Sequence, residues 1–258
     1  MKRLFGTVSF IVLFTIPLSA QDFLNVYGNV GYGFGMGGYF VGSSNTFLDE
    51  EEVSASTEDH FLNLGHGVKF ELGCGVMLLP FLEARVALDL TQGAPSPTIN
   101  SFRSIDDATQ DTVIDYSYSS YGLRVIFAPY FEVFDLVYMY IGTGIVFNSV
   151  RSVQEITITT TEPDQLQTAT LVNEIPLAIG FTGVTGFELP LTETISFMGE
   201  IRFEQMNHKL MRQRVDTVFN FPDMRTVTFE QDDVEREPPP NIPGTNWGVR
   251  VGLKVWVL

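Results

Sequence analysis

The sequence is poor in the residues that build most catalytic and metal-binding sites. It contains one cysteine, Cys74, and three histidines, His60, His66 and His208, which stand far apart. A single cysteine can form neither an intrachain disulfide nor a cysteine-rich zinc site, and histidines this scattered predict neither a metal centre nor a catalytic triad. We therefore expect no catalytic residue, no metal, no cofactor and no enzymatic activity.

Basic residues are also scarce, since 15 Lys and Arg stand against 31 Asp and Glu, for a net charge of −16. Proteins that bind nucleic acid need basic patches to meet the phosphates, so this balance argues against a nucleic-acid partner. Two stretches, 49–59 and 230–237, are rich in acidic residues. They fit solvated, self-repelling loops, and the alternative is that their carboxylates hold divalent cations against lipid phosphates.

Long apolar runs are missing from the body of the chain. A membrane-spanning helix needs about 20 predominantly apolar residues, and the best candidate, 133–147, contains Asp135 and two glycines. The sequence therefore predicts no spanning helix there. Amphipathic strands are the remaining way for this chain to cross a bilayer.

The N-terminus has a different composition from the rest of the chain. A positively charged start is followed by an apolar segment, 4–18, and by small residues just ahead of Gln21. This order is typical of a cleaved signal peptide, and the segment is short for an uncleaved anchor helix, which is the alternative. We expect residues 1–20 to be a signal peptide and residues 21–258 to form one domain.

What the chain does contain is an alternation of apolar and polar residues, most clearly near its C-terminus. From Trp247 to Val257 every second residue is large and apolar, and the positions between them include glycines, Arg250 and Lys254. Successive side chains of a strand point to opposite faces, so the pattern predicts a strand with one face for lipid and one for a polar interior. Seven further segments alternate similarly: 23–39, 61–78, 81–90, 116–127, 136–148, 171–187 and 194–206.

The connections between these segments are alternately short and long. Short ones lie at 79–80, 131–135 and 188–192, and long ones at 41–60, 91–115, 149–170 and 207–246. Short turns at one end and long loops at the other are the pattern of outer-membrane barrels, whose short turns are periplasmic. The sequence therefore predicts an all-β fold, a transmembrane antiparallel β-barrel of eight strands with long extracellular loops and both termini in the periplasm.

Two of the long connections keep some alternation. Residues 153–161 and 167–172 are expected to continue two barrel strands as a hairpin above the membrane, and residues 215–221 and 224–229 to form a second hairpin. If the second hairpin entered the bilayer, the barrel would have ten strands. Its charged residues suit lipid poorly and favour eight strands: Arg212, Arg214, Asp216 and Arg225.

The C-terminal strand also carries a known pattern. Arg250 is followed by Gly252, Val255 and Val257, and the chain ends at Leu258. This resembles the C-terminal assembly signal of bacterial outer-membrane barrels, with valines at the usual aromatic positions and Leu in place of the usual final Phe. Together with the glycine-rich first strand, it resembles small barrels of the OmpA, OmpX and OmpW type, without a peptidoglycan-binding domain.

This resemblance implies a location and a set of partners. The location is the outer membrane, where the barrel would contact lipid and lipopolysaccharide. The barrel-insertion machinery would be the partner during assembly, and the loops would meet an extracellular ligand that the sequence does not identify.

The strand faces opposite the apolar ones place charged residues in the interior. Six positive and six negative residues share these faces, with Asp89 and Glu188 among the negative ones. The other ten form the predicted charge network: Lys69, Glu71, Glu83, Arg85, Arg124, Glu200, Arg202, Glu204, Arg250 and Lys254. Side chains fill the interior of an eight-stranded barrel, and an unpaired buried charge is costly, so we interpret this set as a structural plug of ion pairs. The alternative is a narrow polar passage.

These observations lead to one function and to alternatives from other classes. We expect a non-enzymatic integral outer-membrane protein with a structural or surface-interaction role and a charge-plugged interior. The alternative is a narrow channel or carrier for small molecules, hydrophobic ones included. An outer-membrane enzyme is a third hypothesis, for which no positioned nucleophile stands out.

The assignment of faces has a consequence for substitutions in the last strand. Val251 is assigned to lipid, so Val251→Arg is expected to cost about 2–4 kcal/mol. Gly248 is assigned to the other face at the barrel mouth, where substitution by serine is expected to matter much less.

We predict that the mature protein begins at Gln21 and fractionates with the outer membrane. It should also migrate on gels at a position that depends on heating, because a closed barrel keeps its compact shape in detergent until it is heated. Mass spectrometry of the N-terminus and electrophoresis of heated and unheated membrane fractions check both points. Recovery of the chain as a soluble periplasmic monomer would contradict the prediction.

Overall fold

The computed structural model describes most of the chain. The described residues are 24–47, 55–93, 99–105, 108–134, 137–161, 164–209, 212–220 and 241–257. The expected signal peptide, most of the two acidic stretches, residues 224–229 and Leu258 lie outside them. Among the described residues, no helix has the length and apolar character needed to cross a membrane.

Eight strands form a closed ring in which every strand pairs antiparallel with two neighbours. In ring order they are β1 (Leu24–Gly35), β4 (Gly67–Leu79), β5 (Leu82–Gly93), β7 (Ala108–Phe134), β8 (Val137–Thr161), β9 (Asp164–Pro190), β10 (Ile195–Gln205) and β14 (Asn246–Val257). The ring closes where β1 meets β14, from Leu24 opposite Val257 to Gly35 opposite Asn246. The prediction of an eight-stranded antiparallel barrel is confirmed.

The outer face of the ring is apolar and its inner face is polar. On β14, Trp247, Val251 and Val257 belong to the exposed set, whereas Arg250 and Lys254 are buried. The other ring strands follow the same rule, so leucine, isoleucine, valine and phenylalanine side chains cover the outside. Water does not solvate such a surface favourably, whereas lipid does.

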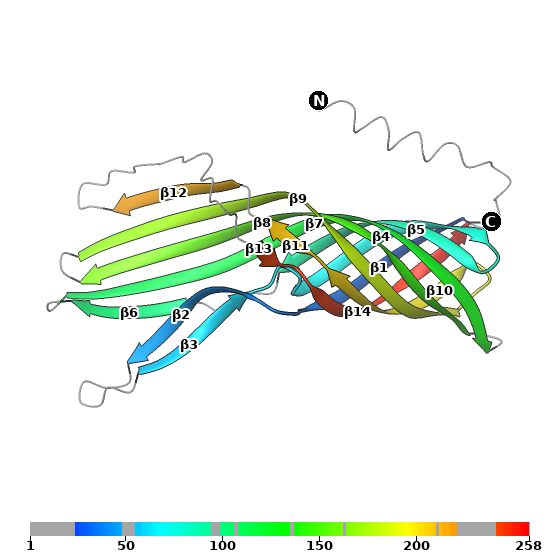
Figure 1. Cartoon of the computed structure of the whole chain (residues 1–258), viewed down its shortest axis with the longest axis horizontal. Helices are drawn as coiled ribbons and strands as arrows, with labels where there is room; N and C mark the ends of the chain where they lie inside the picture. The colour runs from blue at the N-terminus through cyan, green and yellow to red at the C-terminus, as the bar shows by residue number, and fades with distance from the viewer. Residues whose placement is uncertain are drawn as a thin grey trace, which may run out of the picture.

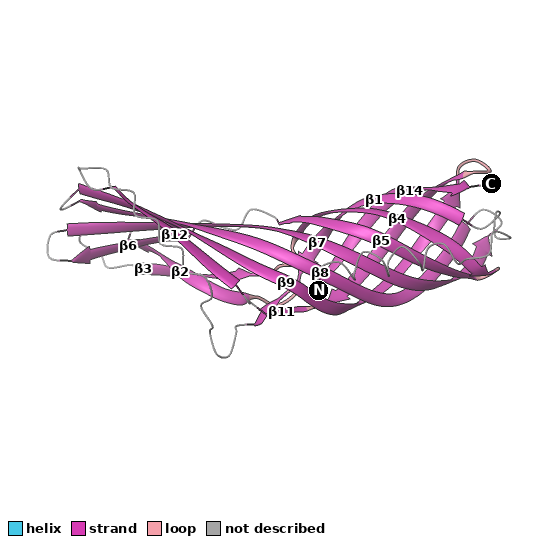
Figure 2. Cartoon of the chain, turned by 90° about the horizontal axis from the view of Figure 1, so that it is seen from above, coloured by secondary structure: helices cyan, strands magenta, loops and turns pink. Residues whose placement is uncertain are grey.

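Three ring strands are much longer than a bilayer crossing. β7 and β9 have 27 residues each, and β8 has 25. At about 3.3 Å per residue these strands are roughly 80–90 Å long, whereas a crossing takes only about 10 residues. Figures 1 and 2 show them continuing as a sheet that projects from one end of the barrel. We call this the sheet end of the barrel, and the opposite end the turn end.

Shorter strands widen the projecting sheet on both sides. β6 (Ile99–Ile105) pairs with β7, and β2 (Tyr39–Phe47) and β3 (Ala55–Leu62) follow beyond it. On the other side, β12 (Arg212–Asn220) pairs with β9. Two very short strands, β11 (Asn207–Lys209) and β13 (Asn241–Pro243), pair with each other.

The long connections therefore contain more strand than the sequence predicts. The hairpin expected at 153–172 is confirmed, because β8 and β9 stay paired as far as Thr161 and Asp164. The second expected hairpin stays a prediction, because its second arm, 224–229, lies outside the described residues; its first arm lies in β12, which pairs with β9. This pairing, which the sequence did not predict, covers the outer edge of β9 and so satisfies a row of backbone groups.

Two predicted strands were too long at the sheet end. β1 stops at Gly35, two residues before Gly37, which has a φ of +75° in the left-handed region that favours glycine. The predicted segment 61–78 is divided as well, because Leu62 ends β3 and β4 begins only at Gly67. The short turns at the other end of the barrel lie between the strands for which they were predicted.

The expectation that serine would matter much less at Gly248 was wrong. Gly248 faces Gly33 across the seam between β14 and β1. A Cβ added there would lie 2.5 Å from the carbonyl oxygen of Tyr32. Backbone atoms cannot move aside as a flexible side chain can, so any larger residue would push the two strands apart.

We predict that Val251→Arg and Gly248→Ser both destabilise the barrel, for different reasons. Val251 is half-exposed on the outer face in the middle of β14, and placing arginine in the bilayer centre costs about 2–4 kcal/mol. The clash at Gly248 should cost about 1–3 kcal/mol. Urea unfolding in lipid vesicles, followed by tryptophan fluorescence, measures both.

The matched control is Ser117→Arg, which puts the same side chain on β7 at an exposed position in the projecting sheet. This variant should lie within about 0.5 kcal/mol of the wild type. Equal stability of Val251→Arg and Ser117→Arg would show that Val251 does not face lipid.

Candidate functional site

The structure places all twelve charged residues of the predicted inner faces inside the ring. They come from β4, β5, β7, β9, β10 and β14, and none is more than 7% exposed. Six carry a positive charge and six a negative charge, so the interior has no net charge. The twelve residues form two clusters that lie at different heights in the barrel.

The first cluster lies nearer the sheet end, and we call it the sheet-side ion cluster. Its members are Lys69, Glu71, Asp89, Arg124, Glu204 and Arg250. Glu71 is its centre, because its carboxylate accepts hydrogen bonds from Arg124 and from Arg250, the latter at 3.0 Å. Lys69 Nζ lies 2.6 Å from Glu204, and Asp89 accepts from Arg250 at 2.9 Å.

The second cluster lies nearer the turn end, and we call it the turn-side ion cluster. Its members are Glu83, Arg85, Glu188, Glu200 and Lys254. Arg85 donates to Glu83 at 2.6 Å and to Glu200 at 2.8 Å, and Lys254 Nζ lies 2.9 Å from Glu188. Arg202 connects the two clusters, since its guanidinium pairs with both Glu71 and Glu200.

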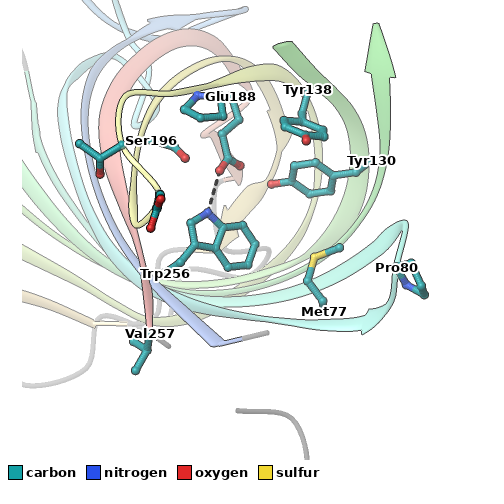
Figure 3. A pocket seen from close by; sticks show the side chains of 11 residues that line it. Met77, Pro80, Tyr130, Tyr138, Glu188, Ser196, Trp256 and Val257 are labelled. Atoms are coloured by element: carbon teal, nitrogen blue, oxygen red, sulfur yellow. Dashed lines mark hydrogen bonds between the residues drawn. The ribbon is translucent and has the colours of Figure 1, made fainter. Parts of the chain in front are cut away.

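Trp256 lies against the turn-side ion cluster, and Figure 3 shows its indole bonded to Glu188. Its indole N–H donates to Glu188 at 3.1 Å, and its ring centroid lies 4.2 Å from Lys254 Nζ. Beyond it, a cavity of about 380 Å³ opens at the turn end. We call this cavity the vestibule.

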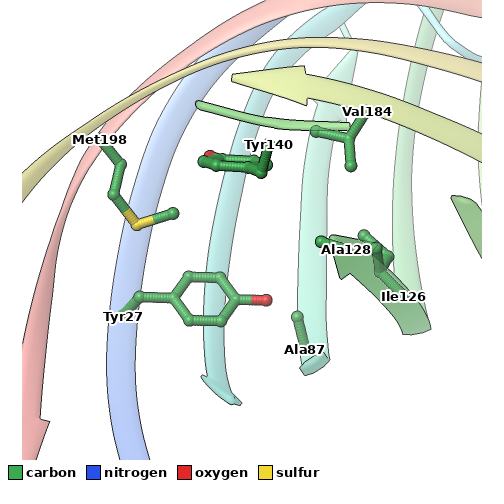
Figure 4. Close-up of a cluster of buried hydrophobic side chains, with 7 residues drawn as sticks. All are labelled: Tyr27, Ala87, Ile126, Ala128, Tyr140, Val184 and Met198. Carbon is green, nitrogen blue, oxygen red and sulfur yellow. The ribbon is translucent and has the colours of Figure 1, made fainter. Parts of the chain in front are cut away.

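A buried cluster of two tyrosine rings and five apolar side chains, shown in Figure 4, lies beside the turn-side ion cluster. The Arg85 guanidinium lies 4.3 Å from the ring centroid of Tyr140 and 5.5 Å from that of Tyr27. The Tyr140 hydroxyl donates to Glu200 at 2.8 Å. Ala87, Ile126, Ala128, Val184 and Met198 complete this packing.

Two glycines make room for the longest charged side chains. A Cβ added at Gly31 would lie 2.5 Å from Cγ of Arg250, and one added at Gly33 would lie 2.6 Å from Cε of Lys69. The side chains of Arg250 and Lys69 therefore extend into the interior past positions of β1 that carry no side chain. At both positions the atom nearest to such a Cβ is a backbone oxygen, of Val249 and of Gly65, so these glycines also let neighbouring backbone approach closely.

An apolar layer closes the sheet end above the sheet-side ion cluster. It consists of Leu62, Leu64, Tyr118, Val150, Ile175 and Ile242, all buried. The Asn63 side chain holds the chain segments at this mouth together by donating to the carbonyl oxygens of Met36 and Gly37, both at 2.9 Å. Leu62, Leu64, Tyr118 and Ile175 lie within the predicted segments, and sequence reasoning missed the layer because alternation alone does not separate an apolar residue that faces lipid from one that is buried.

The three histidines do not come together in one site. His66 lies next to the hydroxyl of Tyr32, with 2.9 Å between Tyr32 Oη and His66 Nε2. His208 is buried in β11 beyond the barrel strands, and burial lowers the pKa of this histidine to about 4. Within the described ranges, no group of three or more His, Cys, Asp or Glu residues is placed to hold a metal ion.

The residues of the resembled assembly signal lie on both faces of β14. Arg250 is buried in the interior, and Gly252 lies against the backbone of Gly28. Val255 and Val257 are exposed on the apolar outer face, and Leu258 lies outside the described residues. Whether these residues are read during assembly stays a prediction.

The outer face of the ring carries aromatic side chains at its two margins. Exposed aromatic side chains lie at both margins of the apolar surface: Phe34, Tyr121 and Trp247 toward the sheet end, and Phe81, Phe131 and Phe187 toward the turn end. An even-numbered closed ring with an apolar outside, aromatic margins and short turns at one end is the architecture of outer-membrane barrels. The chain is a small barrel of the outer-membrane type.

Comparisons with known proteins add no family. No protein-family profile matches the chain, and no curated protein matches it. Solved structures do align over most of its length. Neisserial surface protein A aligns with 90% of this chain and 96% of its own, at 11% identity and a TM-score of 0.39. A major outer membrane protein of Thermus thermophilus aligns with 90% of this chain and 98% of its own, at 11% identity and a TM-score of 0.42. Likenesses this distant assign no function and do not decide between OmpA, OmpX and OmpW types.

One alignment corrects the expectation that the chain is not an enzyme. The outer membrane protease OmpT from Escherichia coli aligns with 94% of this chain and 99% of its own, at 8% identity and a TM-score of 0.38. The exclusion of an enzyme was wrong, because one of the barrels that align with this chain is an enzyme. The likeness is too distant to decide the question, and we assign the chain neither activity nor inactivity.

We predict that Arg202→Ala destabilises the barrel by about 3–5 kcal/mol, or less if water enters. The loss follows because Glu71 and Glu200 would each lose a guanidinium inside the barrel. Urea unfolding in lipid vesicles measures it. Arg151→Ala, which removes an exposed arginine of the projecting sheet, is the control and should change stability by less than about 0.5 kcal/mol. Equal effects of the two variants would refute a stabilising role for Arg202.

Proposed function

We propose that the chain is an integral outer-membrane protein with a structural or surface-interaction role. In this proposal the barrel anchors the projecting sheet in the membrane and its plugged interior bars passage. The turn end and both termini face the periplasm, and the projecting sheet faces the outside.

The filled interior is the observation that carries the proposal. Along the barrel axis, the apolar layer at the sheet end is followed by the sheet-side ion cluster, by Arg202 and by the turn-side ion cluster. Trp256 then covers the last of these. Ion pairs at 2.6 to 3.1 Å, such as those of Lys69, Arg85 and Lys254, link side chains across the interior, and an eight-stranded barrel has room for little besides side chains.

The projecting sheet supports a role at the surface. It is built from continuations of the barrel strands, so it is held rigidly on the membrane anchor. Its outer face carries exposed charged side chains on each of the three long strands, among them Asp115, Arg151 and Glu174. A surface of this kind is solvated, and it is suited to contact with a partner outside the cell.

The proposed partners of the barrel itself follow from its outer face. Outer-membrane lipid and lipopolysaccharide would cover the apolar surface, and the barrel-insertion machinery would act during assembly. A nucleic-acid partner is disfavoured by the net charge of −16.

The alternative function is a narrow channel or carrier for small molecules, hydrophobic ones included. The vestibule favours it to a limited extent, because it opens at the turn end and reaches Tyr130 and Glu188 beside the turn-side ion cluster. On this alternative the ion pairs would have to separate during transport.

Conductance through planar lipid bilayers tests the proposal against the alternative. We expect negligible conductance from the wild type, because the paired side chains fill the barrel. Arg202→Ala should admit small ion currents, since it opens the contact between the two clusters. Large and steady wild-type conductance, with Arg202→Ala only shifting selectivity toward cations, would overturn the plug in favour of the channel.

A further inference from the structure

The vestibule at the turn end has the composition of a binding site. Aromatic rings of Tyr130, Tyr138 and Trp256 contribute to its wall, as Figure 3 shows. Met77, Pro80 and Pro190 add apolar surface. Its volume of about 380 Å³ lies within the range of about 300–1,000 Å³ that is typical of sites for small molecules. Cavities with this mixture of aromatic and polar walls bind small organic ligands.

The charges around the vestibule favour a positive ligand. Glu188 of the turn-side ion cluster lines the cavity, where its carboxylate already accepts from Lys254 and from the Trp256 indole. Glu193 stands at the rim, where it is exposed and makes no ion pair with the described residues. Lys254 is covered by Trp256 and held by Glu83 and Glu188, so its charge is already neutralised. The charge that remains for a ligand is the carboxylate of Glu193, which would repel an entering anion and attract an entering cation.

The aromatic rings strengthen this preference. The face of an aromatic ring attracts a cation, and methylated ammonium groups are bound in proteins by sets of such rings. The molecule already uses this interaction beside the vestibule, where Lys254 Nζ lies 4.9 Å from the ring centroid of Tyr130 and 4.2 Å from that of Trp256. Tyr138 has no cation of this kind among the described residues, and its ring lies in the cavity wall.

A hydroxyl group is also available for hydrogen bonding. Ser196 lines the vestibule, is only 2% exposed, and has no hydrogen-bond partner for its side chain among the described residues. A buried hydroxyl gains from a partner that it can reach. A ligand that carries its own hydroxyl beside the ammonium group would provide one.

From this arrangement we propose that the vestibule binds a small organic cation with a methylated ammonium group. The ammonium group lies against the ring of Tyr138, and Glu193 supplies the opposite charge. A hydroxyl on the ligand bonds to Ser196. The site faces the periplasm if the proposed orientation holds, and it exists whether or not the barrel conducts.

Titration with choline, followed by Trp256 fluorescence, tests the site. The chain has two tryptophans, so Trp247→Phe leaves Trp256 as the single reporter in the folded protein in detergent micelles. We expect a saturable change with choline. The uncharged molecule of the same shape, 3,3-dimethylbutan-1-ol, should give none, because it has the shape of choline without the charge.

Two variants test the assigned residues. Glu193→Gln and Tyr138→Leu should each weaken choline binding roughly two- to fivefold, as expected for one exposed charge pair or one cation–π contact. Glu174→Gln and Tyr121→Leu, which make the same changes outside the vestibule, should leave binding unchanged. Glu193 is exposed at a turn, so its variant is expected to fold even if Tyr138→Leu does not.

Three results would overturn the proposal. The first is the absence of a saturable response to choline in the single-tryptophan protein. The second is an equal response to choline and to 3,3-dimethylbutan-1-ol, which would indicate a merely apolar cavity. The third is unchanged choline affinity in Glu193→Gln.

Discussion

Twelve charges enclosed by eight strands must be solvated by one another, and most of this structure follows from that constraint. The interior is too narrow for water to surround each charge, so each carboxylate lies against cations from other strands, and Glu71 alone pairs with three guanidinium groups. The glycines of β1 leave space for Arg250 and Lys69. The need to pair these charges also fixes the register of the strands, because a slip of one residue would turn the charges toward lipid and the apolar residues inward.

Alternation in the sequence was sufficient to predict the ring and the faces of its strands. It works because a lipid-facing strand must alternate, as β14 does from Trp247 to Val257. It does not reveal which charge lies opposite which, since Glu71 and Arg250 are 179 residues apart and meet only through the order of strands in the ring. The ends of β1 and the pairing of β12 escaped prediction for a related reason. They depend on a left-handed glycine and on the need to cover a strand edge, and neither changes the hydrophobic pattern.

The absence of a catalytic motif proved a weak argument about activity. A barrel offers many inward side chains from strands that are distant in sequence, so a catalytic set would leave no compact motif to find. The same holds for the vestibule, whose walls come from the ends of several strands and the turns between them. Short motifs describe sites built on one loop or one helix, and this interior is built on neither.

Contacts at the sheet end of the barrel also bear on the order in which its strands can become stable. Asn63 donates to the carbonyl of Thr245, and Lys69 donates to Asn246, so residues from the first third of the chain are held by residues near its end. The carboxylates of β4 and β5 consequently lack part of their cations until β14 is in place. Contacts between such distant parts of a chain form slowly. β14 is therefore the strand that completes the pairing of the others, and a ring without it would be left with unpaired charges and an open seam.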